Sequence, residues 1–314
     1  MGFYLLKRAL YTVPMLLGVL TLVFILVRIV PGDPAIVIMG DNATAEALAE
    51  LRTRLGLDLP IWRQYVTFMG DVLSGDLGRS LVTNRPVLAD VWAVLPYTIE
   101  LTITSLAIGV LGGVPLGILA ARKRDGVMDW LARIISLAGL SFPAFISAVL
   151  MLLFFSIHLG WFPVLSRGYP LDEPVERLRS LALPALNLGL IMMAYITRVT
   201  RSAMLKALSE DYMRTARAKG VPGLAVIWRH GFRNVLIPVI TVIGLYFGVL
   251  MGNSVLTEIV FNRPGLGKLI IGALDKRDYT MLQGLMVIYA FIIAVVNLAT
   301  DLAYGFVDPR VKTK

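Results

Sequence analysis

The sequence of 314 residues contains no cysteine, only two histidines and few charged residues, which make up 16% of the chain. Without cysteine there can be no disulfide, no thiol nucleophile and no thiolate ligand for a metal. The histidines, His158 and His230, are too few and too far apart in the sequence for a dedicated histidine metal site. Because the chain is 57% hydrophobic, its composition favours a membrane protein that crosses the bilayer several times over an ordinary soluble domain.

Signatures of catalysis are also missing. Neither HExxH nor Gly-x-Ser-x-Gly occurs in the sequence. The run Pro264 to Lys268 has the glycines and lysine of a nucleotide-binding loop, but such a loop needs glycine where Asn262 stands and serine or threonine where Leu269 stands. We therefore expect a chain that is not an enzyme, binds no metal or cofactor and does not hydrolyse ATP itself.

Six mostly apolar segments are long enough to be membrane spans, because about 20 helical residues cross a hydrocarbon core of roughly 30 Å. We expect them near residues 9–27, 97–121, 131–158, 181–196, 236–255 and 285–304. The fourth is the weakest, since it is short and contains Pro184 and Asn187, and a re-entrant segment is its alternative. The distribution of basic loops favours a crossing. This predicts an all-α membrane protein with six transmembrane helices and both termini in the cytoplasm.

Particular residues within the spans predict how they pack and bend. Gly113 with Gly117, and Gly248 with Gly252, have a spacing of four residues that suits close helix packing. Proline at the end of the run Ser141-Phe-Pro143 should bend the third span, because it cannot donate the helical hydrogen bond. Glu100, the single charge of the second span, is either a contact in a translocation path or a carboxylate at the membrane boundary.

The longest polar stretch, residues 32–95, lies between the first two spans. Amphipathic helices are expected near Ala45–Leu55 and Ile61–Leu73, with glycines as punctuation, and the stretch reads as a small external subdomain. We accordingly divide the chain into three parts. Residues 1–94 hold the first span and the external segment, residues 95–305 form the core transmembrane domain, and residues 306–314 are a cytoplasmic tail.

A basic stretch, Glu210 to Pro238, lies between the fourth and fifth spans. Lysine or arginine occurs in and just before it at positions 206, 214, 217, 219, 229 and 233. Short loops rich in these residues are retained on the cytoplasmic side of a membrane. Strong helix formers from Tyr212 to Lys219 end at Gly220, a typical helix terminator, and a second helical run, Ala225–Leu236, follows. On charge alone the stretch could equally be a solvated turn or a patch against lipid headgroups.

This stretch resembles the cytoplasmic loop of binding-protein-dependent ABC import permeases. In the general family that loop runs Glu-Ala-Ala, three residues and then Gly. Here Ala216 and Gly220 match, whereas Arg214 and Thr215 replace the first two positions. The run DYMRTARAKG resembles the dipeptide/oligopeptide/nickel branch of the family. Further strings resemble the same branch in order along the chain: PGDP, LGLDLPIWRQY, SGDLGRSL, RPV, and VFNRPGLGKL followed by RDY.

The resemblance covers nearly the full chain and implies the transmembrane subunit of a type I ABC importer in the cytoplasmic (inner) membrane of a bacterium. The implied partners are a second homologous permease subunit, two ATPase subunits that hold ATP and Mg²⁺, and an external substrate-binding protein. Membrane lipid would surround the subunit, and no nucleic acid is expected.

The solute implied is a dipeptide, an oligopeptide or a peptide-like molecule such as glutathione. Nickel complexes and oligosaccharides are alternatives within the same branch. An ion-coupled secondary transporter is the alternative of another class. It would predict charged residues at the centres of the spans, which the sequence lacks.

The resemblance also implies a coupling loop, residues 198–234, that docks into a cleft on an ATPase subunit. The residues expected to carry this role are Glu210, Asp211, Tyr212, Arg214, Thr215, Ala216, Arg217, Ala218, Lys219 and Gly220. The helix before the terminating glycine is expected to move as a rigid lever. Its basic side chains would offer charge to the partner surface, while Tyr212 and Ala216 would pack into the cleft.

Overall fold

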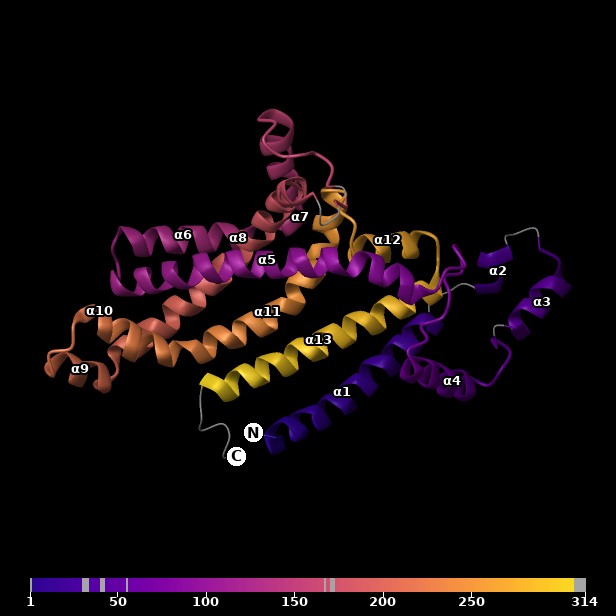
Figure 1. The fold of residues 1–314 in the computed structure, drawn as a ribbon, viewed down its shortest axis with the longest axis horizontal. Helices are drawn as coiled ribbons and strands as arrows, with labels where there is room; N and C mark the ends of the chain where they lie inside the picture. The colour runs from indigo at the N-terminus through magenta and orange to yellow at the C-terminus, as the bar shows by residue number, and fades with distance from the viewer. Residues whose placement is uncertain are drawn as a thin grey trace. The chain divides into compact units, whose positions relative to one another are not determined.

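The computed structural model describes residues 2–29, 34–39, 43–54, 56–166, 168–169 and 173–307, which are almost entirely helical (Figure 1). Within these ranges there is no β-strand, only an isolated bridge between Arg79 and Pro86. The basic tail, which contains Asp308-Pro-Arg310, lies outside the described residues, as does most of the PGDP string. The elements in chain order are α1 (Gly2–Ile29), α2 (Pro34–Met39), α3 (Ala45–Arg54), α4 (Ile61–Ser74), α5 (Val87–Arg122), α6 (Val127–Ser141), α7 (Ala144–Met151), η1 (Leu152–His158), α8 (Pro174–Ser209), α9 (Asp211–Ala218), α10 (Gly223–Ala225), η2 (Val226–Phe232), α11 (Arg233–Val260), α12 (Leu266–Asp275) and α13 (Tyr279–Val307).

In the described ranges, five helices are long and apolar enough to cross a membrane: α1, α5, α8, the continuous run α10 to α11, and α13. A sixth span results if α6 and the following α7–η1 are counted together. These two segments meet at a bend of 101°, where Pro143 directly precedes α7. The predicted bend at this proline is therefore confirmed. An angle this large is typical of a broken span or of a re-entrant loop. From the sequence, a re-entrant segment is the alternative for the fourth span, not for this one.

The fourth span is not the short segment that we expected, although its mean hydropathy of 1.6 is the lowest of the five single-helix spans in the described residues. In place of a short segment at 181–196, α8 runs for 36 residues, and its apolar window is 67% buried, more than that of any other candidate span in the described residues. The Asn187 amide donates to the Ala144 carbonyl (3.0 Å) and accepts from the Ser147 hydroxyl (2.6 Å). Pro184 is buried inside the helix without ending it. Polarity that looked unfavourable in lipid is thus satisfied by a neighbouring helix.

Other boundaries differ from the sequence expectation mainly by being wider. The second span was expected from Tyr97, but α5 begins at Val87. The helical run and the fifth span that were expected as two pieces form one continuous helical stretch, 223–260. The amphipathic helices expected in the polar stretch are confirmed as α3 and α4, and α4 ends at Gly75, whose φ of +80° favours glycine. Leu55, the expected end of the first of them, lies outside the described residues.

The chain divides into two compact units. The first unit comprises Met1–Leu5, Tyr97–Pro264 and Val296–Lys314, and the second comprises Leu6–Pro96 and Gly265–Val295. In the first unit α8 packs against α5, α6 and α11, and the three helices α5, α8 and α11 share one apolar core (Figure 1). Since α8 contributes buried residues along most of its length, it is the central helix of this unit.

Glycines on α5 allow its backbone to approach α8 closely. A Cβ atom at Gly113 would lie 2.9 Å from the Ile196 Cβ, and one at Gly117 would lie 2.7 Å from the Thr200 Cβ. Real side chains do not tolerate such distances, so the predicted close packing is confirmed for this pair. For the second pair, Gly248 and Gly252, the prediction of close packing against another helix of this chain is wrong. A Cβ at either position would meet no described atom within 4 Å.

The second unit is built on aromatic contacts between α1 and α4. The Phe24 ring lies 5.3 Å from the Tyr65 ring and 5.7 Å from the Phe68 ring, and the Tyr65 hydroxyl lies 2.8 Å from the Thr21 hydroxyl. Val287 of α13 joins the same apolar cluster. Aromatic burial of this kind contributes both buried area and ring-to-ring attraction.

Two of the strings that carried the family resemblance meet in this unit. The Ser80 hydroxyl of SGDLGRSL donates to the Asp278 carboxylate of RDY at 2.5 Å. The same carboxylate accepts from the backbone N–H groups of Leu81 and Met281, both at 3.1 Å. These strings therefore fix a turn to the start of α13.

We predict that Gly113→Ala destabilises the protein whereas Gly252→Ala does not. Both changes add one methyl group inside a helix, where alanine is intrinsically favoured over glycine. At Gly113 the methyl group would overlap α8, and overpacking of this kind costs about 1–3 kcal/mol. The measurement is the thermal unfolding midpoint of the purified proteins in detergent. Equal midpoints for the two variants would contradict the close approach of α5 and α8.

Candidate functional site

The segment between α8 and α11 forms a short helix that folds back on itself. After α8 ends at Ser209, Glu210 is extended and α9 begins at Asp211. Residues 198–209, expected as the start of the coupling loop, are therefore the last turns of α8. Gly220, with φ +77°, accomplishes the turn after α9.

The hydrogen bonds around this turn are those of a Schellman motif. The Gly220 N–H donates to the Arg217 carbonyl at 3.0 Å, and the Val221 N–H donates to the Ala216 carbonyl at 3.3 Å. Because these bonds need a left-handed residue at position 220, glycine is the residue that ends α9 without strain. The predicted helix terminator is confirmed.

One face of α9 is buried in its own chain. Met213 and Ala216 pack against Val226 of η2, with Leu208 and Val221 beside them. The expectation that Ala216 packs into a partner's cleft does not fit this geometry, because its side chain is covered by η2. The sequence reading missed Met213, although its spacing of three residues from Ala216 marks a common helix face.

The outer face of α9 carries the remaining expected residues. Those exposed in the chain are Glu210, Asp211, Tyr212, Arg214, Thr215, Arg217, Ala218, Lys219 and Gly220. Tyr212 is restrained, since its hydroxyl accepts a hydrogen bond from the Asn234 amide of α11 at 2.9 Å. The Arg214–Asp211 ion pair, at 3.6 Å, is fully exposed and contributes little to stability. The structure thus brings the basic residues together on one solvent-facing surface.

Methionine side chains pack beneath α9. A Cβ atom at Gly231 of η2 would lie 2.8 Å from the Met204 Cε of α8 and 3.3 Å from the Met213 Cε of α9. Methionine side chains from two helices therefore meet at one glycine. The end of α8, α9 and η2 thus contact one another.

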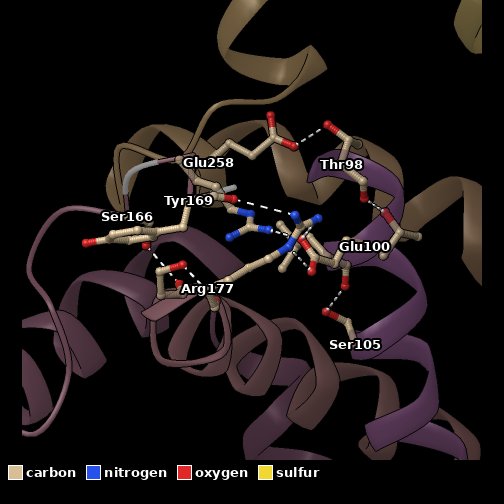
Figure 2. A network of polar contacts seen from close by, with 11 residues as sticks. Thr98, Glu100, Ser105, Ser166, Tyr169, Arg177 and Glu258 are labelled. Atoms are coloured by element: carbon tan, nitrogen blue, oxygen red, sulfur yellow. Dashed lines mark hydrogen bonds and ion pairs between the residues drawn. The ribbon is translucent and has the colours of Figure 1, made fainter. Parts of the chain in front are cut away.

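The first unit has a second polar centre, which we name the Glu100 cluster (Thr98, Glu100, Arg177, Glu258 and Arg263). Figure 2 shows it, with Thr98, Glu100, Arg177 and Glu258 labelled. The Glu100 carboxylate accepts from the Arg177 Nε at 2.9 Å and from the Arg263 Nη2 at 2.7 Å. The Thr98 hydroxyl donates to the Glu258 carboxylate at 2.7 Å. Neither interpretation of Glu100 made from the sequence foresaw these pairs, because both arginines are far away in the chain.

Burial makes this cluster energetically demanding. Arg263 is only 1% exposed and Glu258 is fully buried, while the Glu100 side chain is 24% exposed. Burial lowers the pKa of the Arg263 guanidinium, and the nearby Glu100 carboxylate opposes that shift. The cluster joins α5, the start of α8, the end of α11 and the segment after it.

A third centre, the Asp129 cluster (Asp125, Asp129, Arg133 and Arg201), ties α6 to α8. Asp129, in the first turn of α6, is fully buried and accepts from Arg201 of α8 through two nitrogens, one of them at 2.8 Å. Arg133 donates to Asp129 at 2.5 Å and to Asp125 at 2.9 Å. Among the described residues no group of three or more histidine, aspartate or glutamate side chains is placed to hold a metal ion.

Comparison with known proteins identifies relatives over nearly the whole chain. Residues 113–313 match the family profile described as binding-protein-dependent transport system inner membrane component, and residues 1–102 match the profile of the N-terminal part of such components. The chain is 40% identical to the dipeptide transport system permease protein DppB of Alkalihalophilus pseudofirmus, over 98% of this chain and 99% of that one. It is 41% identical to the glutathione transport system permease protein GsiC of Salmonella typhimurium, over 99% of each chain.

The fold also resembles a solved structure. A chain from the inward facing conformations of the MetNI methionine ABC transporter superposes with a TM-score of 0.57. The match covers 71% of this chain and 96% of that chain at 18% identity, so it speaks for the fold alone.

We predict that Glu100→Gln lowers the stability of the purified protein by about 3–5 kcal/mol, because it removes the negative charge that pairs directly with the buried Arg263. The matched control is Asp211→Asn, which removes an acid from an ion pair exposed to solvent and should leave the thermal unfolding midpoint unchanged. If the two variants unfold at the same temperature in detergent, the Glu100 cluster does not have the energetic role assigned to it.

Proposed function

The chain belongs to the family of inner membrane components of binding-protein-dependent transport systems, and from that membership we propose that it is the permease subunit of an importer of dipeptides, oligopeptides or glutathione. As a member of this family it is a multi-pass membrane transport subunit and not an enzyme. Family membership implies ATPase and substrate-binding partners in general. The dipeptide and glutathione permeases are its relatives along almost their full length, which supports a peptide-like solute.

The finer arrangement is part of the proposal. A second homologous permease completes the pathway, two ATPase subunits bind on the cytoplasmic side, and a substrate-binding protein delivers the solute from outside. Both termini and α9 lie in the cytoplasm. ATP and Mg²⁺ belong to the ATPase subunits, which supply the energy for import.

The observation that carries the proposal is the form of α9: an exposed basic surface on a rigid apolar base. Its cationic side chains attract a partner over a distance, and charge complementarity sets how fast and in which orientation the surfaces meet. Met213 and Ala216, underneath, connect any displacement of α9 to η2 and to the end of α8. Movement of the ATPase subunits is thereby transmitted to two membrane helices at once.

Import then follows from a change between two packings of the helix bundle. An energy source can shift such an equilibrium only by binding one packing more tightly than the other. We propose that closure of the ATPase subunits favours the packing open to the outside, and that their separation favours the packing open to the cytoplasm. The clusters around Glu100 and Asp129 keep α8 attached to α5 and α6, so α8 is expected to move with these helices.

We predict that the chain transports a labelled dipeptide into proteoliposomes only when its partner permease, ATPase subunits, binding protein and ATP are all present. The solute panel should include a dipeptide, a tetrapeptide, glutathione and a nickel complex. Uptake of the first three in preference to the nickel complex supports the peptide assignment. Uptake by this chain without ATPase subunits, driven by an ion gradient, would overturn the proposal in favour of a secondary transporter.

We predict that Arg217→Glu weakens assembly with the ATPase subunits by about tenfold or more, because it reverses charge on the outer face of α9. The control is Arg63→Glu, the same change on the exposed surface of α4, far from α9 in the sequence. Assembly is measured by pull-down at a series of salt concentrations. Equal losses for both variants, or undiminished assembly and transport of Arg217→Glu, would remove α9 from the contact.

A further inference from the structure

A groove of about 500 Å³ opens between α6 and α8 in the first unit, apart from the exposed face of α9. Its lining includes Arg133, Ser136, Leu137, Leu140, Arg198 and Arg201. Three arginines on membrane helices are unusual, because each costs free energy in hydrocarbon unless it has a partner or reaches water. The question is therefore which anion balances them.

The protein's own carboxylates balance only part of this charge. Arg201 and Arg133 are paired with Asp129, and Arg133 also contacts Asp125. Arg198 makes no hydrogen bond or ion pair with any residue in the described ranges, and its side chain is exposed. The lining of the groove thus carries three guanidiniums and no carboxylate. Asp129 and Asp125, which lie outside the lining, pair with two of the three, and Asp125 also pairs with Arg124, so the charge of Arg198 is not matched among the described residues.

The groove changes character along its length. Arg133 of α6 and Arg201 of α8 lie beside the buried Asp129, which is in the first turn of α6. Leu137 and Leu140 lie farther along α6, and at 1.5 Å per residue Leu140 is roughly 10 Å deeper than Arg133. Next to this lining, Trp130 and Ile134 of α6 are largely exposed, as expected for a lipid-facing helix with an aromatic residue at the interface.

A basic end followed by an aliphatic end is the chemical pattern of a phospholipid. We propose that the groove binds an anionic phospholipid, whose phosphate contacts Arg198 and Arg133 while the first part of its acyl chains lies against Leu137 and Leu140. Guanidinium groups bind phosphate through paired N–H donors, and the hydroxyl of Ser136 lies in the same lining. Basic pockets between membrane helices on the cytoplasmic side are suited to such headgroups.

The bound lipid would join α6 to α8 beside the Asp129 cluster. Its phosphate would supply the negative charge that no residue of the described chain supplies to Arg198. The assignment of this groove to the cytoplasmic leaflet depends on the orientation given under the proposed function. The proposal of lipid binding depends only on the lining and the charges of the groove.

The test measures lipid binding to the purified full chain in detergent by native mass spectrometry. Phosphatidylglycerol and phosphatidylcholine with identical acyl chains are the probes. We expect at least tenfold tighter binding of phosphatidylglycerol to the wild type, and loss of that preference in Arg198→Gln. Arg122→Gln, which removes an exposed arginine at the end of α5 outside the groove, is the matched control and should behave as wild type. Arg198→Lys keeps the charge and should retain most of the preference.

Several outcomes would overturn the proposal. These are equal binding of the two lipids by the wild type, equal losses in the Arg198 and Arg122 variants, or no loss in Arg198→Gln. Inorganic phosphate is the second probe, because it shares the headgroup's charge but has no acyl chain. Inorganic phosphate and additional phosphatidylglycerol are compared, at equal concentration, for their ability to displace bound phosphatidylglycerol. If phosphate displaces it equally well, the site is an anion site and not a lipid site.

The leaflet is tested separately. The chain has no native cysteine, so Lys219→Cys gives one defined position for a membrane-impermeant thiol reagent. Labelling only from the cytoplasmic side supports the orientation, and labelling only from outside overturns it. Because lipid preference is measured in detergent without partners or transport, it can fail while import is intact, and import can fail while lipid preference is intact.

Discussion

Arginines near the two ends of α8 pair with carboxylates on neighbouring helices, and these pairs organise the first unit. Near its beginning, α8 presents Arg177 to Glu100 of α5, and near its end it presents Arg201 to Asp129 of α6. A lone buried charge costs several kcal/mol, so each pair strongly favours the packing in which both partners meet. Between the two ends, glycines of α5 bring the backbones together. The ion pairs therefore fix where neighbouring helices lie along α8, whereas the glycines fix how closely α5 approaches it.

The sequence was a good guide where the determining chemistry is local. Proline at 143 removes a helical hydrogen bond, glycine at 220 takes a left-handed conformation, and long apolar runs make α1 and α13. It was a poor guide where a residue's partner lies elsewhere. Asn187 looked like a weakness in a span until its partners on α7 were known. The arginines that neutralise Glu100 lie 77 and 163 positions away, a separation that no periodicity reveals.

The candidate coupling site divides in the same way. Its basic outer face and its end at Gly220 follow from short-range patterns, and its family resemblance places it among transport components. The base on which it rests does not follow, because Met204, Met213 and Gly231 come together from three elements. Ala216 shows the consequence: an alanine within a functional motif can serve its own chain's packing, not a partner. Exposed basic side chains and buried apolar side chains thus lie on different faces of one short helix.

The element η2 (Val226–Phe232), which joins α10 to α11, is π-helical, and this bears on the rotation of α11 about its own axis. A π-helical turn contains one residue more than an α-helical turn. Each α-helical residue advances the chain by roughly 100° around the axis, so tightening η2 by a single residue would spin α11 through about that angle. Such a twist would exchange the side chains that α11 directs toward α8 while both helix axes stayed in place. The extra residue of η2 therefore sets the rotation of α11 about its own axis, and it does so in the element against which α9 packs.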